Sequence, residues 1–128
     1  MSSDLRYLSL DDLLALTVDL GVGPVRDFGL LDSAAHRPQS EYFGTDSYPT
    51  VALKAAALPH LLVKNHALID GNKRLAWHSA VVFADLNGFE PKLTVDQAYE
   101  LVMAAAQGQI DVAEISERLQ LRAKRQTN

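Results

Sequence analysis

The chain has 128 residues, of which 48% are hydrophobic and 22% are charged, with a formal net charge of −4 and no cysteine. This composition predicts a single globular domain over residues 1–128 and excludes disulfides and thiol chemistry. The negative charge argues against direct nucleic-acid binding, and the longest apolar run is shorter than the ~20 residues of a membrane-spanning helix. Because nothing resembles a signal peptide, we expect a cytoplasmic protein.

Apolar residues recur at three- and four-residue spacing along most of the chain, which predicts an all-α fold. The expected helices span about residues 10–20, 27–36, 50–65, 71–86, 94–106 and 111–119. Ser9 with Asp12 and Thr94 with Gln97 form capping-box pairs at the starts of the first and fifth helices. The expected architecture is therefore a compact bundle of about six helices.

A non-helical segment separates the second and third helices. Arg37 precedes Pro38, and a residue before proline avoids the helical region, so the second helix should end there. The turn-forming residues that follow, up to Pro49, predict a flap or short hairpin. Its aromatic residues either pack on the body of the domain or dock a protein target: Tyr42, Phe43 and Tyr48.

The third helix should be central, because it is apolar on nearly all sides. Pro59 lies inside it and removes one helical hydrogen bond, so we expect a kink near residues 55–59 or two shorter helices. His60 fits a packing histidine better than a site residue. Arg37 fits either a structural ion pair or a role near phosphate or the flap.

The stretch from His66 to Arg74, H-A-L-I-D-G-N-K-R, carries most of the reactive side chains and precedes a long apolar run. Asp70 is a suitable N-cap for a helix that opens at about Gly71. The first backbone N–H groups of a helix lack partners and attract anions, so this turn predicts a phosphate site. Lys73 and Arg74 oppose the helix dipole there and require an external anion to explain them.

Two further groups complete this candidate site. His66 can take a proton near neutral pH, and Asp70 can hold Mg²⁺ against phosphate oxygens. Taken singly, each of these residues also fits an ordinary turn and helix cap. Their occurrence within nine residues indicates catalysis.

The remaining helices are predicted to pack into the core. After the run ends at Asn87 and Gly88, two amphipathic segments follow, and the chain closes on basic residues near Arg122 and Arg125. Residues 121–128 are expected to be a frayed basic tail.

The stretch resembles the motif of the Fic/Doc superfamily, H-x-F-x-D/E-G/A-N-G/K-R/K, and in particular its Doc (death on curing) branch, where lysine follows asparagine. The matching residues are His66, Asp70, Gly71, Asn72, Lys73 and Arg74. Similar residues occur upstream in G-L-L-D-S-A-A-H-R-P-Q (29–39) and Y-F-G-T-D-S-Y-P (42–49), and downstream in L-N-G-F (86–89).

The resemblance implies a toxin that transfers a phosphoryl group from ATP, with Mg²⁺, to a Thr or Ser hydroxyl of elongation factor Tu. It also implies arrested translation and a Phd-type antitoxin partner. In such a protein His66, Asp70 and Lys73 are catalytic and Asp70 binds the metal. Residues 71–74 bind the phosphates, and the flap holds the target beside the histidine.

Five positions depart from the usual pattern of the family. Leu68 replaces phenylalanine, while Lys73 and Trp77 replace a glycine and an arginine that are usual in adenylylating Fic enzymes; Leu75 and His78 replace the threonine and asparagine that are usual in Doc. Two alternatives stay open. One is a Fic-like adenylyl or nucleotidyl transferase, and the other is a non-catalytic domain that binds a nucleotide or a partner.

Overall fold

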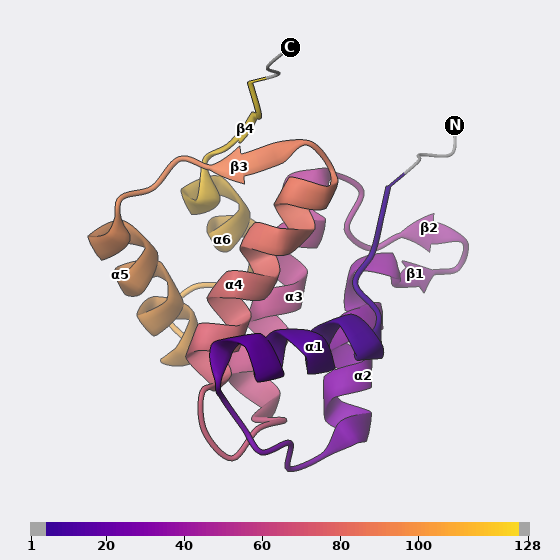
Figure 1. Cartoon of the computed structure of the whole chain (residues 1–128). Coiled ribbons are helices and arrows are strands. Elements are labelled where there is room, and N and C mark those ends of the chain that lie inside the picture. Colours follow the sequence, from indigo (N-terminus) through magenta and orange to yellow (C-terminus); the bar gives the residue numbers. More distant parts are fainter. Residues whose placement is uncertain (1–4, 126–128) are drawn as a thin grey trace.

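The computed structural model describes residues 5–125 and contains six α-helices and two short two-stranded sheets (Figure 1). The helices are α1 (Leu10–Leu20), α2 (Phe28–His36), α3 (Val51–Asn65), α4 (Asn72–Leu86), α5 (Val95–Ala106) and α6 (Val112–Leu119), with a 3-10 turn at Arg37–Gln39. The strands are β1 (Glu41–Tyr42), β2 (Thr45–Asp46), β3 (Phe89–Pro91) and β4 (Leu121–Ala123). The predicted all-α fold with a short hairpin is confirmed.

The core is built around α3 and α4, which run in opposite directions through the centre of the molecule (Figure 1). Small side chains on α3, Ala55 to Ala57, are fully buried, and Phe83 of α4 is the largest of the completely buried side chains. Helices α1 and α2 pack on one side of this pair, and α5 and α6 on the other. The loop that joins α3 to α4 is thereby held at one end of the bundle.

Pro59 does not divide the third helix. The structure assigns α3 as one span through Pro59, so the alternative of two helices is wrong. Proline removes a single hydrogen bond, and the burial of six consecutive residues around it, 54–59, holds the helix together.

Both predicted capping pairs are confirmed, and a third helix start is capped in a similar way. Ser9 and Asp12 exchange both bonds of a capping box at α1, and Thr94 and Gln97 do so at α5. Asp111 accepts the backbone N–H of Glu114 at α6.

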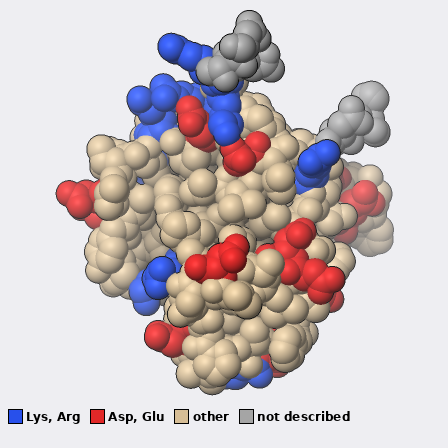
Figure 2. Space-filling view, viewed as in Figure 1, with Lys and Arg blue, Asp and Glu red and all other residues tan. Residues whose placement is uncertain are grey.

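The C-terminal segment is not frayed where the structure describes it. Strand β4 pairs antiparallel with β3, Arg122 lies 3.4 Å from Glu90, and Lys124 forms an ion pair with Asp85. In Figure 2, blue and red side chains accordingly lie close together near the end of the described chain. The predicted tail is therefore wrong for residues 121–124, while residues 126–128 lie outside the described part. None of the helices in residues 5–125 is long and apolar enough to cross a membrane.

Candidate active site

The loop from His66 to Gly71 connects the two central helices and carries the predicted site. His66 ends α3 in the left-handed conformation, with φ +51°, and its side chain is exposed. A non-glycine residue with positive φ is uncommon and needs support from its surroundings. That conformation turns the chain sharply out of α3 and leaves the imidazole accessible.

A second segment, residues 21–27, braces this loop. The backbone N–H of Arg26 donates to Ala67 at 2.7 Å, that of Ile69 to Pro24 at 2.9 Å, and that of Gly23 to Asp70 at 2.9 Å. Leu68 is 2% exposed and forms a β-bridge with Val25. Leu68 therefore buries an apolar anchor where the family motif has phenylalanine.

The Arg26 side chain holds the end of α3. Its Nε donates to the carbonyl of His66 at 2.8 Å, and its terminal nitrogen donates to the carbonyl of Asn65 at 3.1 Å. The last carbonyls of a helix lack intrahelical donors, so this cation satisfies two of them. Arg26 therefore fixes the backbone from which the imidazole of His66 projects.

Helix α4 begins one residue later than predicted, and Asp70 does not cap it. Gly71 is the N-cap residue, with φ +93°, and no side chain caps the helix. Asn72 instead closes the loop, because its side chain accepts from the N–H of Leu68 at 3.0 Å and donates to the carbonyl of Leu68 at 2.9 Å. The prediction of Asp70 as N-cap is wrong, and the Asn72 side chain is engaged in the loop, so only its backbone N–H could face a phosphate.

Position 71 requires glycine because the side chain of Val22 lies very close to its backbone. A Cβ atom there would overlap Cβ and Cγ1 of Val22, which lies in the bracing segment. The two segments thus pack backbone against side chain at the point where α4 starts.

Asp70 presents an exposed carboxylate beside this helix start. Residues 5–125 contain no cluster of three or more His, Cys, Asp and Glu side chains that could enclose a metal ion. A single carboxylate fits Mg²⁺, which commonly takes one or two protein carboxylates and completes its shell with phosphates and water. Metal binding by Asp70 stays a prediction.

Lys73 and Arg74 lie in the first turn of α4 and are both exposed. Within the described residues, neither side chain lies within ion-pairing distance of a carboxylate. Together with the uncapped N–H groups of the helix start, they form a cationic end that can bind an anion such as phosphate.

The sequence pattern of the Fic/DOC family matches residues 7–84 of this chain. The chain belongs to the Fic/DOC family. It is also 45% identical over 118 residues to a protein of Mycolicibacterium smegmatis named Toxin Doc, covering 89% of this chain and 91% of that protein. The predicted membership of the Doc branch is thereby confirmed.

In this Fic/DOC chain a groove adjoins the cationic end. It lies between the first half of α4 and α5 and has a volume of about 480 Å³. Its wall is mainly apolar and aromatic, and it is lined by Lys73, Arg74, Trp77, His78, Leu93, Thr94, Val95, Ala98, Tyr99, Val102 and Met103. A groove of this size and character is typical of a small-molecule site.

The flap of this family member lies away from His66. Asp46 of β2 contacts Lys54 in the first turns of α3, whereas His66 follows the last turn of that helix (Figure 1). A 15-residue helix is about 22 Å long. A target segment added to the β1–β2 hairpin would therefore not lie beside His66, and the expected placement of the flap is wrong in this structure.

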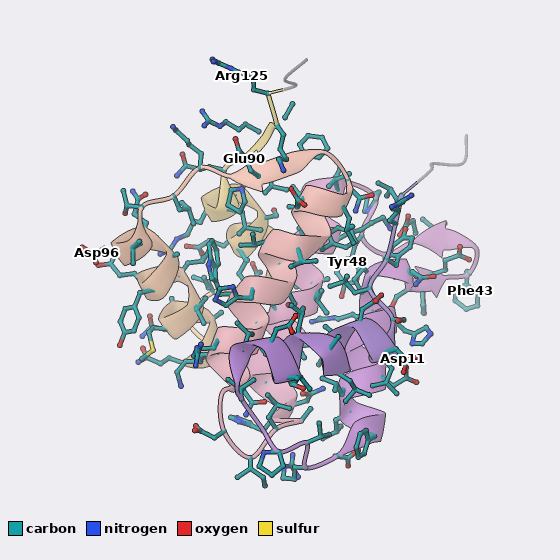
Figure 3. All side chains as sticks on the ribbon, in the orientation of Figure 1. Asp11, Phe43, Tyr48, Glu90, Asp96 and Arg125 are labelled. Atoms are coloured by element: carbon teal, nitrogen blue, oxygen red, sulfur yellow. The ribbon has the colours of Figure 1, made fainter. Side chains whose placement is uncertain are left out.

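The three flap aromatics divide into two kinds. Tyr42 is 71% and Phe43 90% exposed, and their ring centroids lie 4.5 Å apart at the hairpin tip. Tyr48 lies against the body of the domain, while Phe43 points away from it (Figure 3). Packing on the body is therefore the correct interpretation for Tyr48 alone.

Arg37 has a structural role. It donates to the hydroxyl of Tyr48 at 2.9 Å and to the carbonyl of Ala57 at 3.0 Å, and it lies 2.8 Å from Nδ1 of His60. Burial, followed by the charge of Arg37, holds the pKa of His60 below its usual value. Both residues thus join the flap to α3, as expected for a packing histidine.

Lys54, which the sequence motifs do not single out, anchors the flap from inside. It is buried, donates to the carbonyl of Pro38 at 2.9 Å and pairs with Asp46 at 2.9 Å. The hydrogen bond from Lys54 lowers the pKa of the Asp46 carboxyl. A lysine within the apolar first half of α3 was the available signal, since such a charge is buried only when it is paired.

Proposed function

We propose that this protein is a toxin of the Doc type that transfers the γ-phosphoryl group of ATP to a Thr or Ser hydroxyl of a protein target. Elongation factor Tu is the proposed target, and arrest of translation is the proposed effect. The observation that carries the proposal is the start of α4, where an uncapped helix end and the exposed Lys73 and Arg74 follow His66 within one short loop.

In the proposed reaction His66 accepts the proton of the target hydroxyl. The hydroxyl oxygen forms a bond to the γ-phosphorus as the bond between that phosphorus and the β–γ bridging oxygen breaks, and ADP leaves. Lys73, Arg74 and the backbone N–H groups of residues 72–74 stabilise the charge on the transferring group, and such electrostatic stabilisation, with positioning, accounts for most of the catalysis of phosphoryl transfer. Mg²⁺ held by Asp70 would neutralise charge on the phosphates.

The proposal also includes a protein partner and a cellular compartment. A toxin with this activity needs an inhibitor, and we propose a Phd-type antitoxin as that partner, with the cytoplasm as the compartment of both. The similarity to a relative named Toxin Doc supports a toxin–antitoxin system.

A labelling experiment tests the reaction. The protein is incubated with elongation factor Tu, Mg²⁺ and ATP labelled either at the γ- or at the α-phosphate, alongside His66→Ala. We expect label in the target only from γ-labelled ATP, and none with His66→Ala while its circular dichroism spectrum is unchanged. Label from α-labelled ATP would instead establish adenylyl transfer, and growth arrest by His66→Ala equal to that by the wild type would favour a binding domain.

A further inference from the structure

The groove between α4 and α5 is continuous with the cationic end of the site. Lys73 and Arg74 line one part of it, and Trp77, Tyr99 and Met103 line another. Trp77 is half-buried and packs against the hydrophobic core, where it borders a void of about 10 Å³ that Pro59 also lines. The core therefore contacts one side of Trp77, and the side chain also lines the groove.

The groove has a cationic part and an apolar, aromatic part, which match the phosphates and the base of a nucleoside triphosphate. An anionic chain would bind at Lys73 and Arg74, and a planar, largely apolar base would pack between aromatic and thioether side chains. Stacking of a base on an aromatic ring is favourable and tolerates any base, because every base has a π-face.

The groove has few groups that could read the edge of a base. Among the described residues that line it, none carries a carboxamide or a carboxylate. The hydroxyl of Tyr99 and the imidazole of His78 also line it, and because each of these groups can donate or accept, neither specifies one purine. Thr94 is engaged elsewhere, since its N–H donates to Gln97 at 2.9 Å and its hydroxyl oxygen accepts from the N–H of Gln97 at 3.1 Å. Adenine and guanine differ in the donors and acceptors of their edges, and Asn, Gln, Asp, Glu, Arg and Lys side chains can distinguish them. In the proposed placement the two cations of the groove, Lys73 and Arg74, contact the phosphates and not the base.

We propose that this groove binds the base of the nucleoside triphosphate by stacking and apolar packing, and that the protein accepts ATP and GTP with similar affinity. The inference rests on the proposed function only for the position of the phosphates at Lys73 and Arg74. A site built to hydrogen-bond its ligand rejects an analogue that lacks the matching group by several orders of magnitude. The described lining of this groove holds no carboxamide or carboxylate side chain that would impose such a rejection.

The protein offers an internal probe, because Trp77 is its only tryptophan. Non-hydrolysable imido analogues of ATP and GTP are titrated with Mg²⁺, with tryptophan emission and calorimetry as readouts, and inorganic tripolyphosphate serves as a ligand without a base. We expect both analogues to change the emission and to have Kd values within about threefold of each other. We expect tripolyphosphate to bind more weakly and to leave the emission nearly unchanged.

Substitutions at Tyr99 test the groove itself. Tyr99 is 66% exposed, so its replacement should not unfold the protein. Tyr99→Ala should weaken both analogues by roughly tenfold, whereas Tyr99→Phe, which keeps the ring, should restore binding. Phe28→Ala removes an exposed aromatic residue of α2 outside the groove and should leave both Kd values unchanged.

Three results would overturn the inference. They are a preference of more than about thirtyfold for one purine, unchanged emission with both analogues, and unchanged affinity in Tyr99→Ala. Each is distinguishable from failure of the proposed function. Equal binding of ATP and GTP without transfer to elongation factor Tu would leave the groove inference standing, and transfer from ATP with exclusion of GTP would leave only the proposed function.

Discussion

Arg26 donates from Nε to the backbone carbonyl of His66 at 2.8 Å, although 40 positions separate the two residues in the sequence. The guanidinium approaches the carbonyl of His66 and not its ring, so it orients the backbone that carries the candidate base. Arg26 is therefore a positioning residue.

Replacing Arg26 by Met should lower kcat of the proposed transfer by roughly tenfold, because small misplacements of a reacting group are costly. Arg26 is exposed, so the melting temperature should change little. The measurement is steady-state kinetics together with the pH profile of kcat. A proportional loss of kcat and of folded protein would show that Arg26 acts only on stability.

Gly71 should not tolerate a side chain. Gly71→Ala adds a Cβ that meets Val22 and forces alanine to φ +93°, and we expect a loss of about 2–4 kcal/mol in unfolding free energy. Gly44→Ala is the matched control, because Gly44 also has positive φ, +78°, but has nothing within 4 Å of the added atom. It should cost about 1 kcal/mol. If urea unfolding showed the same loss of unfolding free energy for Gly71→Ala and Gly44→Ala, the contact with Val22 would be unimportant.

The two partners of the Lys54–Asp46 pair should respond unequally to removal. The Lys54 side chain is 4% exposed and that of Asp46 43%. Asp46→Ala leaves a buried charge without its carboxylate and should cost about 2–3 kcal/mol, whereas Lys54→Met leaves Asp46 able to reach water and should cost about 1 kcal/mol or less. The double variant should resemble Lys54→Met. A larger loss for Lys54→Met than for Asp46→Ala would contradict this account of the flap anchor.

Stability should fall on mild acidification because of His60. The pKa of His60 in the folded protein lies below the usual 6.5. Its contribution to the free energy of unfolding is therefore fully present above pH 6.5 and is lost as the pH falls through that folded pKa. The groups that affect it are Arg37, Lys64 and Asp111. His60→Gln keeps an acceptor for Arg37 and does not titrate. Urea unfolding between about pH 7 and 5 should give a shallower pH dependence for His60→Gln, and identical slopes would exclude His60 as the cause.

Interactions within one turn of the chain could be predicted from the sequence, and those between distant segments could not. The capping pairs at Ser9 and Thr94 follow from residues three positions apart. The bonds from Arg26 to His66 and from Gly23 to Asp70 depend on the packing of α1, α3 and α4, which no local pattern specifies.

In the candidate site, too, local features could be predicted from the sequence and contacts between distant segments could not. The motif predicted the residues His66 to Arg74, but Asp70 as N-cap was wrong because the Asn72 side chain bonds back to Leu68 and moves the helix start. The groove was missed because Trp77 and Tyr99 lie on separate helices and each fits a packing residue in its local sequence. The flap was placed beside the histidine by resemblance alone, and the length of α3 separates them.

We propose phosphoryl transfer to elongation factor Tu with His66 as the base. Its most direct test is the intact mass of purified elongation factor Tu after incubation with this protein, ATP and Mg²⁺, in parallel with His66→Ala. We expect a gain of about 80 Da, one phosphoryl group, that is absent with His66→Ala. A gain corresponding to an adenylyl group, or a gain of one phosphoryl group that persists with His66→Ala, would contradict the claim.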